Sequence, residues 1–160
     1  MCSFVIIIGL VIVVQVYGYQ ESENLSLTQT TVKNNADNPH LFNEVYSSNW
    51  VKFGLSYKRY GPSVHDKYYN YDACRLVVPI HDNYSFTSDG IIDTYGYLYN
   101  NSFHPSSPDQ NLLFADDDSG GNGQFRFTVS LVPNVTYILV VTTGMGHTYQ
   151  QQHQTIRLLR

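Results

Sequence analysis

Apolar and polar residues alternate with a period of two through much of this chain, and this pattern limits the fold more than any other feature. The clearest case is the segment 124–132, where polar residues separate four apolar ones: Phe125, Phe127, Val129 and Leu131. Successive side chains of an extended strand point to opposite faces, so these four would share one face. No segment carries an apolar stripe at the helical period over a useful length. We therefore expect an all-β protein.

Further segments of this kind follow one another at a spacing of roughly ten residues. The expected strands are 50–57, 74–78, 83–87, 91–99, 112–115, 124–132, 135–143 and 154–159. The segment 135–143 is apolar at nearly every position, which is typical of a strand buried on both faces. Seven or eight short strands at this spacing predict an antiparallel β-sandwich. A chain of 160 residues is long enough for one such domain.

The N-terminus carries an apolar run over residues 4–14, followed by Val16, Tyr17 and Gly18. The run is too short to cross the ~30 Å of a bilayer core comfortably, and it fits the core of a secretory signal peptide. Small residues three places and one place before a cut are typical of signal cleavage, which predicts a cut after Gly18. No Lys or Arg precedes the run, and an uncleaved membrane anchor is the alternative.

The composition divides the chain into four expected parts. Residues 1–18 would be the signal peptide, and the polar segment 19–45 a disordered linker that cannot bury enough apolar surface to order itself. Residues 46–145 would form the sandwich, and the glutamine-rich tail 146–160 is a candidate for a last strand.

Cysteines and glycosylation sequons bear on the compartment. Cys2 would leave with the signal, so Cys74 stands alone, and its place in an alternating strand favours burial over pairing between chains. Four sequons occur, with acceptors at Asn24, Asn83, Asn100 and Asn134. The last three fall in expected turns, where a glycan is accommodated. We therefore expect an exported chain that carries glycans at these sequons. The alternative is that the four asparagines are ordinary turn residues without a glycan.

Charge and motifs exclude several classes of function. The formal net charge is −4, so the chain has no basic field for phosphates, and a nucleic-acid partner is not expected. The six histidines form no HExxH motif, and no G-x-S-x-G segment occurs. Cys74 lacks an activating neighbour in its strand. We expect no enzyme activity; a hydrolase is the least favoured alternative.

Three segments in a fixed order carry a family resemblance. They are DTYGYLY at 93–99, NLLFADDDSGG at 111–121 and VPNVTYILVV at 132–141. This series resembles the pre-peptidase C-terminal domain, a module attached to secreted bacterial peptidases and found in extracellular animal proteins. The resemblance implies a non-catalytic jelly-roll sandwich, and in some relatives binding of calcium or of matrix polymers such as collagen. Two features depart from the family pattern: Gly96 replaces an apolar residue, and the tail from Gly146 replaces a full final strand.

The acidic loop 116–123, with the sequence DDDSGGNG, is the leading candidate site. Adjacent carboxylates repel one another, and Ca²⁺ would relieve this repulsion with hard oxygen ligands. Glycines would allow backbone carbonyls to turn inward. The expected ligands are Asp116, Asp118 and Asn122, with Asp93 from the neighbouring strand. The alternative is a solvated turn in which the carboxylates accept hydrogen bonds from nearby backbone N–H groups.

A row of tyrosines is the second candidate. Tyr95, Tyr97 and Tyr99 alternate along one strand, and the family register places Gly96 and Leu98 inward. The tyrosines would then line the outer face, where aromatic rings stack on sugars or hold a polymer. The alternative is that they pack as core or rim residues. The expected function is thus a secreted binding or stabilising module that contacts carbohydrate or matrix polymer. The alternative is a structural glycoprotein held at the cell surface by the N-terminal segment.

Overall fold

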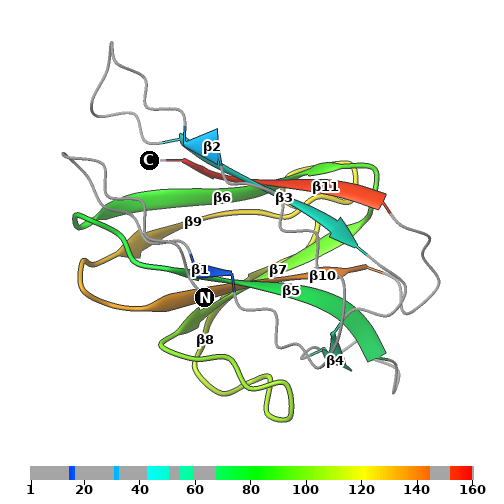
Figure 1. The fold of residues 1–160 in the computed structure, drawn as a ribbon, viewed down its shortest axis with the longest axis horizontal. Coiled ribbons are helices and arrows are strands. Elements are labelled where there is room, and N and C mark those ends of the chain that lie inside the picture. Colours follow the sequence, from blue (N-terminus) through cyan, green and yellow to red (C-terminus); the bar gives the residue numbers. More distant parts are fainter. Residues whose placement is uncertain are drawn as a thin grey trace.

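The computed structural model describes residues 15–16, 31–32, 43–50, 55–59, 68–144 and 152–159, and these form strands and connections without a helix (Figure 1). The strands are β1 (Gln15–Val16), β2 (Thr31–Val32), β3 (Asn43–Trp50), β4 (Ser56–Lys58), β5 (Tyr68–Leu76), β6 (Asp82–Gly90), β7 (Thr94–Asn100), β8 (Leu112–Asp116), β9 (Arg126–Leu131), β10 (Tyr137–Thr143) and β11 (Gln152–Leu159). Eight of them have five or more residues. None of the described segments is a helix with the length and apolarity that crossing a membrane requires.

The strands form two antiparallel sheets that lie one above the other in Figure 1. The first sheet has the order β5-β10-β7-β8, and both β1 and β4 pair with β5. The second sheet has the order β3-β11-β6-β9, with β2 beside β3. The expected antiparallel β-sandwich is therefore confirmed.

The strand pairs are nested along the chain. The innermost pair is β7 with β8, which is enclosed by β6 with β9, then by β5 with β10, and finally by β3 with β11. Successive pairs of this long hairpin lie in different sheets. In the first sheet β10 pairs with β7 as well as with β5, and in the second sheet β11 pairs with β6 as well as with β3. This connectivity is that of a jelly roll, in which a folded-over hairpin wraps into two Greek keys.

The alternating apolar residues of the sequence are the ones that the structure buries. In β9 the inward positions Phe127 and Leu131 are buried, whereas Arg126, Thr128 and Ser130 are exposed. The neighbouring strand β10 is buried along nearly its whole length, because it lies between β5 and β7 and both of its faces are covered. The predictions for these two segments are confirmed.

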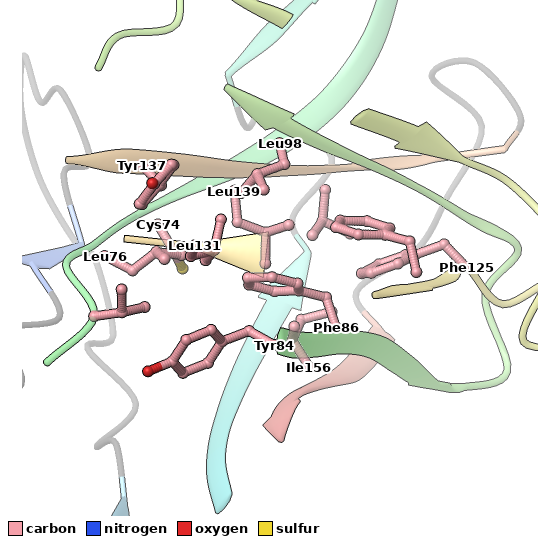
Figure 2. Packing of buried hydrophobic residues seen from close by; sticks show 13 residues of the cluster. Cys74, Leu76, Tyr84, Phe86, Leu98, Phe125, Leu131, Tyr137, Leu139 and Ile156 are labelled. Carbon is pink, nitrogen blue, oxygen red and sulfur yellow. The ribbon is translucent and has the colours of Figure 1, made fainter. Parts of the chain in front are cut away.

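The main core fills the space between the two sheets (Figure 2). Leu139 of the first sheet points toward Phe86 and Ile156 of the second, and the rings of Phe86, Phe125 and Phe127 stack beside them. The buried members are Cys74, Leu76, Val78, Tyr84, Phe86, Leu98, Phe125, Phe127, Leu131, Tyr137, Leu139, Val141 and Ile156. Cys74 is buried in this core, as expected.

Gly96 is the family departure for which the structure gives a packing reason. A Cβ placed on Gly96 would lie only 2.6 Å from Cδ2 of Phe125. The phenyl ring of Phe125 therefore occupies the space that an apolar side chain at position 96 would take, and Phe125 is fully buried there.

Two expected boundaries differ in the structure. The strand expected at 50–57 is replaced by β3, which ends at Trp50, and β4, which begins at Ser56. β2 and the first residues of β3 fall within the segment 19–45 that the sequence indicated as a linker. The rest of that linker, and all of the N-terminal segment except β1, lie outside the described residues.

The glutamine-rich tail contains β11, which lies between β3 and β6 in the second sheet. Ile156 of this strand is buried in the main core. The last strand that the sequence indicated in the tail is therefore confirmed, and it is a full member of the second sheet.

Candidate functional site

The acidic loop between β8 and β9 is a compact turn built on left-handed residues. Gly121, Asn122 and Gly123 have φ values of 78°, 57° and 69°. Glycine and asparagine adopt this region most readily, which explains their place here. The amide of Gly120 donates to the carbonyl of Gln124 at 2.8 Å, and that of Gln124 donates to the carbonyl of Gly121 at 3.1 Å. The sequence GGNG thus closes the loop on itself.

The loop is fixed to the connection that precedes β7. The buried side-chain amide of Gln124 donates to the carbonyl of Ile92 at 2.7 Å, and the amide of Thr94 donates to the carbonyl of Gly123 at 2.8 Å. These two bonds flank Asp93 in the sequence. They bring Asp93 beside the acidic loop, although more than twenty residues separate the two in the chain.

Three carboxylates meet at this point. Ligand oxygens of Asp93, Asp117 and Asp118 all lie within 4.8 Å of one another. We call these three residues the carboxylate cluster. Oδ1 of Asp93 is buried and has no hydrogen-bond partner among the described residues. A Cβ at position 144 would overlap the Asp93 carboxylate, so Gly144 is needed to leave room for it.

The electrostatics of the cluster disfavour its full negative charge. Burial raises the pKa of Asp93 above its ordinary value, and the charge of Asp118 raises it further. Burial likewise raises the pKa of Asp117, with further contributions from Asp118 and Asp93. A cation bound among the three carboxylates would reverse both shifts, because it would favour the charged forms.

Arg59 is the positively charged residue that acts on the carboxylate cluster. Its guanidinium lies 4.1 Å from the ring centroid of Tyr69 and 4.7 Å from that of Tyr95. It also donates to the carbonyl of Thr143 at 3.2 Å. This charge lowers the pKa of both Asp93 and Asp117, but burial and the neighbouring carboxylates outweigh it.

Only two of the four residues expected as ligands lie together in the cluster. Asp93 and Asp118 belong to the cluster, and Asp117 joins them in place of Asp116. The Asp116 carboxylate accepts hydrogen bonds from the amide of Ser119 at 3.2 Å, its hydroxyl at 2.6 Å and the amide of Arg126 at 2.8 Å. Asp116 thus behaves as the turn interpretation predicted. The exposed Asn122 contributes its left-handed backbone to the loop.

The tyrosine row lies on the outer face of the first sheet, in the register that places Leu98 in the main core. The rings of Tyr95 and Tyr97 stack with their centroids 4.7 Å apart, and those of Tyr97 and Tyr99 are 6.4 Å apart. Tyr97 and Tyr99 are, however, only 1% and 0% exposed. The expectation of an exposed row is wrong for these two residues, and Tyr95 is half-buried.

A layer of aromatic residues covers the row. Tyr57 of β4, Tyr71 of β5 and Phe103 of the β7–β8 connection contact one another edge to face at centroid distances of 5.1 to 5.3 Å. We call these three residues the aromatic cover. The ring of Phe103 also lies 4.9 Å from that of Tyr99. The short strand β4 and the β7–β8 connection gave no sequence signal that indicated this cover.

The tyrosine row and the carboxylate cluster meet at Tyr95. Burial raises the pKa of its phenol, and the charge of Asp117 raises it further. Arg59 stacks on the ring of Tyr95. The two candidate sites therefore share one end of the first sheet, where β7 begins and β10 ends.

The described histidine side chains form hydrogen bonds at the surface. His81 bonds to Ser130 at 3.0 Å, and His104 bonds to Ser102 at 3.1 Å. Asn111 donates to the same Ser102 hydroxyl at 3.0 Å. The other four histidines, His40, His65, His147 and His153, have side chains outside the described part of the chain. The His81–Ser130 and His104–Ser102 pairs both lie away from the carboxylate cluster.

Comparisons of the chain with protein-family models, with characterised proteins and with solved structures give no match. The resemblance to the pre-peptidase C-terminal domain therefore remains a prediction that rests on the three sequence segments and their order.

Proposed function

We propose that this protein is an extracellular, non-catalytic β-sandwich module that binds Ca²⁺ at the carboxylate cluster and contacts an extracellular polymer. The observation that carries the proposal is the meeting of three carboxylates around the buried, unpartnered Oδ1 of Asp93. A buried polar atom without a partner is costly, and a ligand that pairs with it removes that cost.

The chemistry of the cluster favours Ca²⁺. All three side chains supply oxygen atoms, which hard cations prefer. Calcium accepts six to eight oxygens in flexible geometry, so backbone carbonyls and water would complete the set. The rise in the pKa of Asp93 and Asp117 is the electrostatic cost that the ion would offset. Extracellular modules bind Ca²⁺ with dissociation constants of roughly 0.1–1 mM, and we expect an affinity in that range.

The polymer contact is proposed for the rim of the first sheet beside the cluster. Tyr68 is 49% exposed, and the ammonium group of Lys58 lies 5.9 Å from its ring centroid. Tyr95 is half-buried at the same end of the first sheet, on its outer face. The alternation along β5 turns Tyr68 toward the other face, so the two rings lie on either side of this rim. Exposed aromatic rings stack on sugar rings and on proline-rich chains, so carbohydrate or matrix protein is the proposed partner. Buried Tyr97 and Tyr99 have no part in this contact.

Calcium binding is tested by titration calorimetry and thermal unfolding of the chain after chelator treatment. We expect binding heat and a rise in Tm on adding Ca²⁺, and loss of both in Asp118→Ala. Asp109→Asn is the matched control, because Asp109 is an exposed carboxylate in a different loop. Equal responses in all three proteins, or no response in the parent, would overturn the calcium site.

Export is tested by the mass of the product in a secreting cell. We expect a chain in the medium that begins at Tyr19. Cleavage after Gly18 removes β1 but retains the eight longer strands. A chain that keeps Met1 and stays in the membrane fraction would support the anchored glycoprotein instead.

A further inference from the structure

Three of the four sequon asparagines lie in the described part of the chain, and the register places all three at one end of the sandwich. Asn83 is the second residue of β6 and pairs with Ser130, next to the last residue of β9. Asn100 is the last residue of β7 and pairs with Tyr137, the first residue of β10. Asn134 lies in the turn that joins β9 to β10, drawn in orange at the left of Figure 1.

A backbone hydrogen bond joins two of these sequons. The amide of Asn101 donates to the carbonyl of Thr136 at 2.8 Å. Asn101 is the middle residue of one sequon, and Thr136 is the hydroxyl residue of another. We call the end of the sandwich that holds Asn83, Asn100 and Asn134 the sequon end.

The three acceptor side chains are free to carry a glycan. Each is exposed. Within the described residues, no hydrogen bond engages the side-chain amide nitrogen of any of them. Asn134 has a φ of 63°, so it adopts the left-handed conformation within the β9–β10 turn. A glycan attached to each would extend into solvent without displacing a packed group.

The carboxylate cluster lies at the opposite end. Asp93 precedes Thr94, which pairs with Thr143 where β10 ends. The seven residues of β7 separate this point from Asn100, a distance of about 20 Å at the usual rise per residue. The chain thus places every described sequon at one end and the cluster at the other.

From this arrangement we propose that N-linked glycans on Asn83, Asn100 and Asn134 together cover the sequon end. They leave the cluster end as the surface that meets extracellular partners. Glycans are bulky and strongly hydrated, so they exclude large molecules from the surface around them. The inference rests on the export in the proposed function, since N-glycosylation takes place in the secretory pathway.

Site occupancy is measured on the full chain expressed in a glycosylating cell. A C-terminal extension with a flexible linker and one added sequon reports whether the chain reaches the lumen. The chain carries Asn24→Gln throughout, so that the fourth sequon does not contribute. We then expect three glycans, at Asn83, Asn100 and Asn134, in addition to the reporter glycan, and peptide N-glycosidase should remove all of them. One glycan should be lost in each single variant that changes an acceptor: Asn83→Gln, Asn100→Gln or Asn134→Gln. The same loss is expected when the hydroxyl residue of a sequon is changed instead, in Ser85→Ala, Ser102→Ala or Thr136→Ala.

The reporter separates two ways in which the proposal fails. A glycosylated reporter with empty native sites overturns the glycan cover but leaves export intact. A reporter without a glycan shows that the chain does not reach the lumen, and this contradicts both the proposed function and the inference that rests on it.

Shielding of one end is measured with a bulky thiol reagent. Val132→Cys places a thiol at the sequon end, beside Asn134, and Ile91→Cys places one at the cluster end. Their native side chains are 40% and 85% exposed. We expect peptide N-glycosidase to raise the labelling rate of the first variant several-fold and to leave the second unchanged. The parent chain supplies the background from Cys74. Equal acceleration of both variants, or of neither, would overturn the shielding.

Discussion

Gly96 and Phe125 share one site in the core, and each fits only because of the other. A Cβ at position 96 would lie 2.6 Å from the Phe125 ring, closer than packed carbon atoms come. We predict that Gly96→Ala lowers the free energy of unfolding by about 1–3 kcal/mol, the usual cost of overpacking. Urea denaturation measures this loss. The double variant with Phe125→Leu should lose less than the sum of its two single changes, and strict additivity would contradict the shared site.

Asp93 makes stability depend on pH. Burial and the charge of Asp118 raise its pKa in the folded state. The folded chain then binds a proton more tightly than the unfolded chain does. The free energy of unfolding therefore falls as pH rises from the ordinary aspartate value near ~4 through the raised folded value. Below the ordinary value both states are protonated, and this effect vanishes.

We therefore predict that Asp93→Asn is more stable than the parent at pH 7 in the presence of chelator, and that this advantage disappears near pH ~4. Paired urea denaturation curves at the two pH values measure the difference. Asp109→Asn, in an exposed loop, should show no such advantage at either pH. An Asp93→Asn advantage that is the same at both pH values would rule out the linkage.

The candidate site was predictable only to the level of the loop. Three adjacent carboxylates and a run of glycines indicate an acidic turn, and Asp93 is the ligand expected from the neighbouring strand. Which carboxylate points into the cluster depends on the turn itself. Asp116 ends β8 and accepts three hydrogen bonds from the loop and from Arg126, which leaves Asp117 to face Asp93. That exchange depends on tertiary hydrogen bonds that no local pattern reveals.

Among the elements, β4 and the β7–β8 connection turn a row of surface tyrosines into a second apolar cluster. Tyr57 of β4 is 2% exposed, and its hydroxyl has no hydrogen-bond partner among the described residues. The hydroxyl of Tyr99 beneath it donates instead to the carbonyl of Pro108 at 2.9 Å. The cover thus gains its stability from ring packing and loses some of it through one unpaired hydroxyl.

Two substitutions at Tyr57 separate these contributions. Tyr57→Ala removes a buried ring and should cost about 3–5 kcal/mol of unfolding free energy. Tyr57→Phe keeps the ring and removes the unpaired hydroxyl, so it should be at least as stable as the parent. Urea denaturation gives both values, and acrylamide quenching of tyrosine fluorescence should increase in the alanine variant alone. A destabilised phenylalanine variant would show that the hydroxyl has a partner.

The accuracy of strand prediction followed the strength of the alternation. β9 was predicted well because its large apolar residues alternate regularly, so burial alone sets its register. β10 was predicted from the opposite signal, a nearly continuous apolar run that is typical of a strand covered on both faces. The segment 43–50, with the sequence NEVYSSNW, has few apolar residues, and its strand forms through its pairing with β11. Such a strand owes its structure to a partner more than one hundred residues away, which the local sequence does not encode.

At the scale of the whole molecule, β11 closes the sandwich. It is paired on one side with β3 and on the other with β6, and it contributes Ile156 to the main core. We predict that a chain ending before Gln152 loses its cooperative thermal transition, because the second sheet would then be split. Ile156→Val should keep the transition and cost only about 0.5–1.5 kcal/mol. A cooperative transition in the truncated chain would mean that β6 and β9 hold the sheet without β11.

The outermost pair also fixes where the polypeptide enters and leaves. Asn43 pairs with Leu159, and Leu159 pairs in turn with Ser85 near the start of β6. The first residue of β3 and the last residue of β11 are thus neighbours on the side that holds Asn83. A module or a bead fused directly after β11 would be tethered from that side. The carboxylates of Asp93, Asp117 and Asp118 would then be displayed at the tip farthest from the attachment.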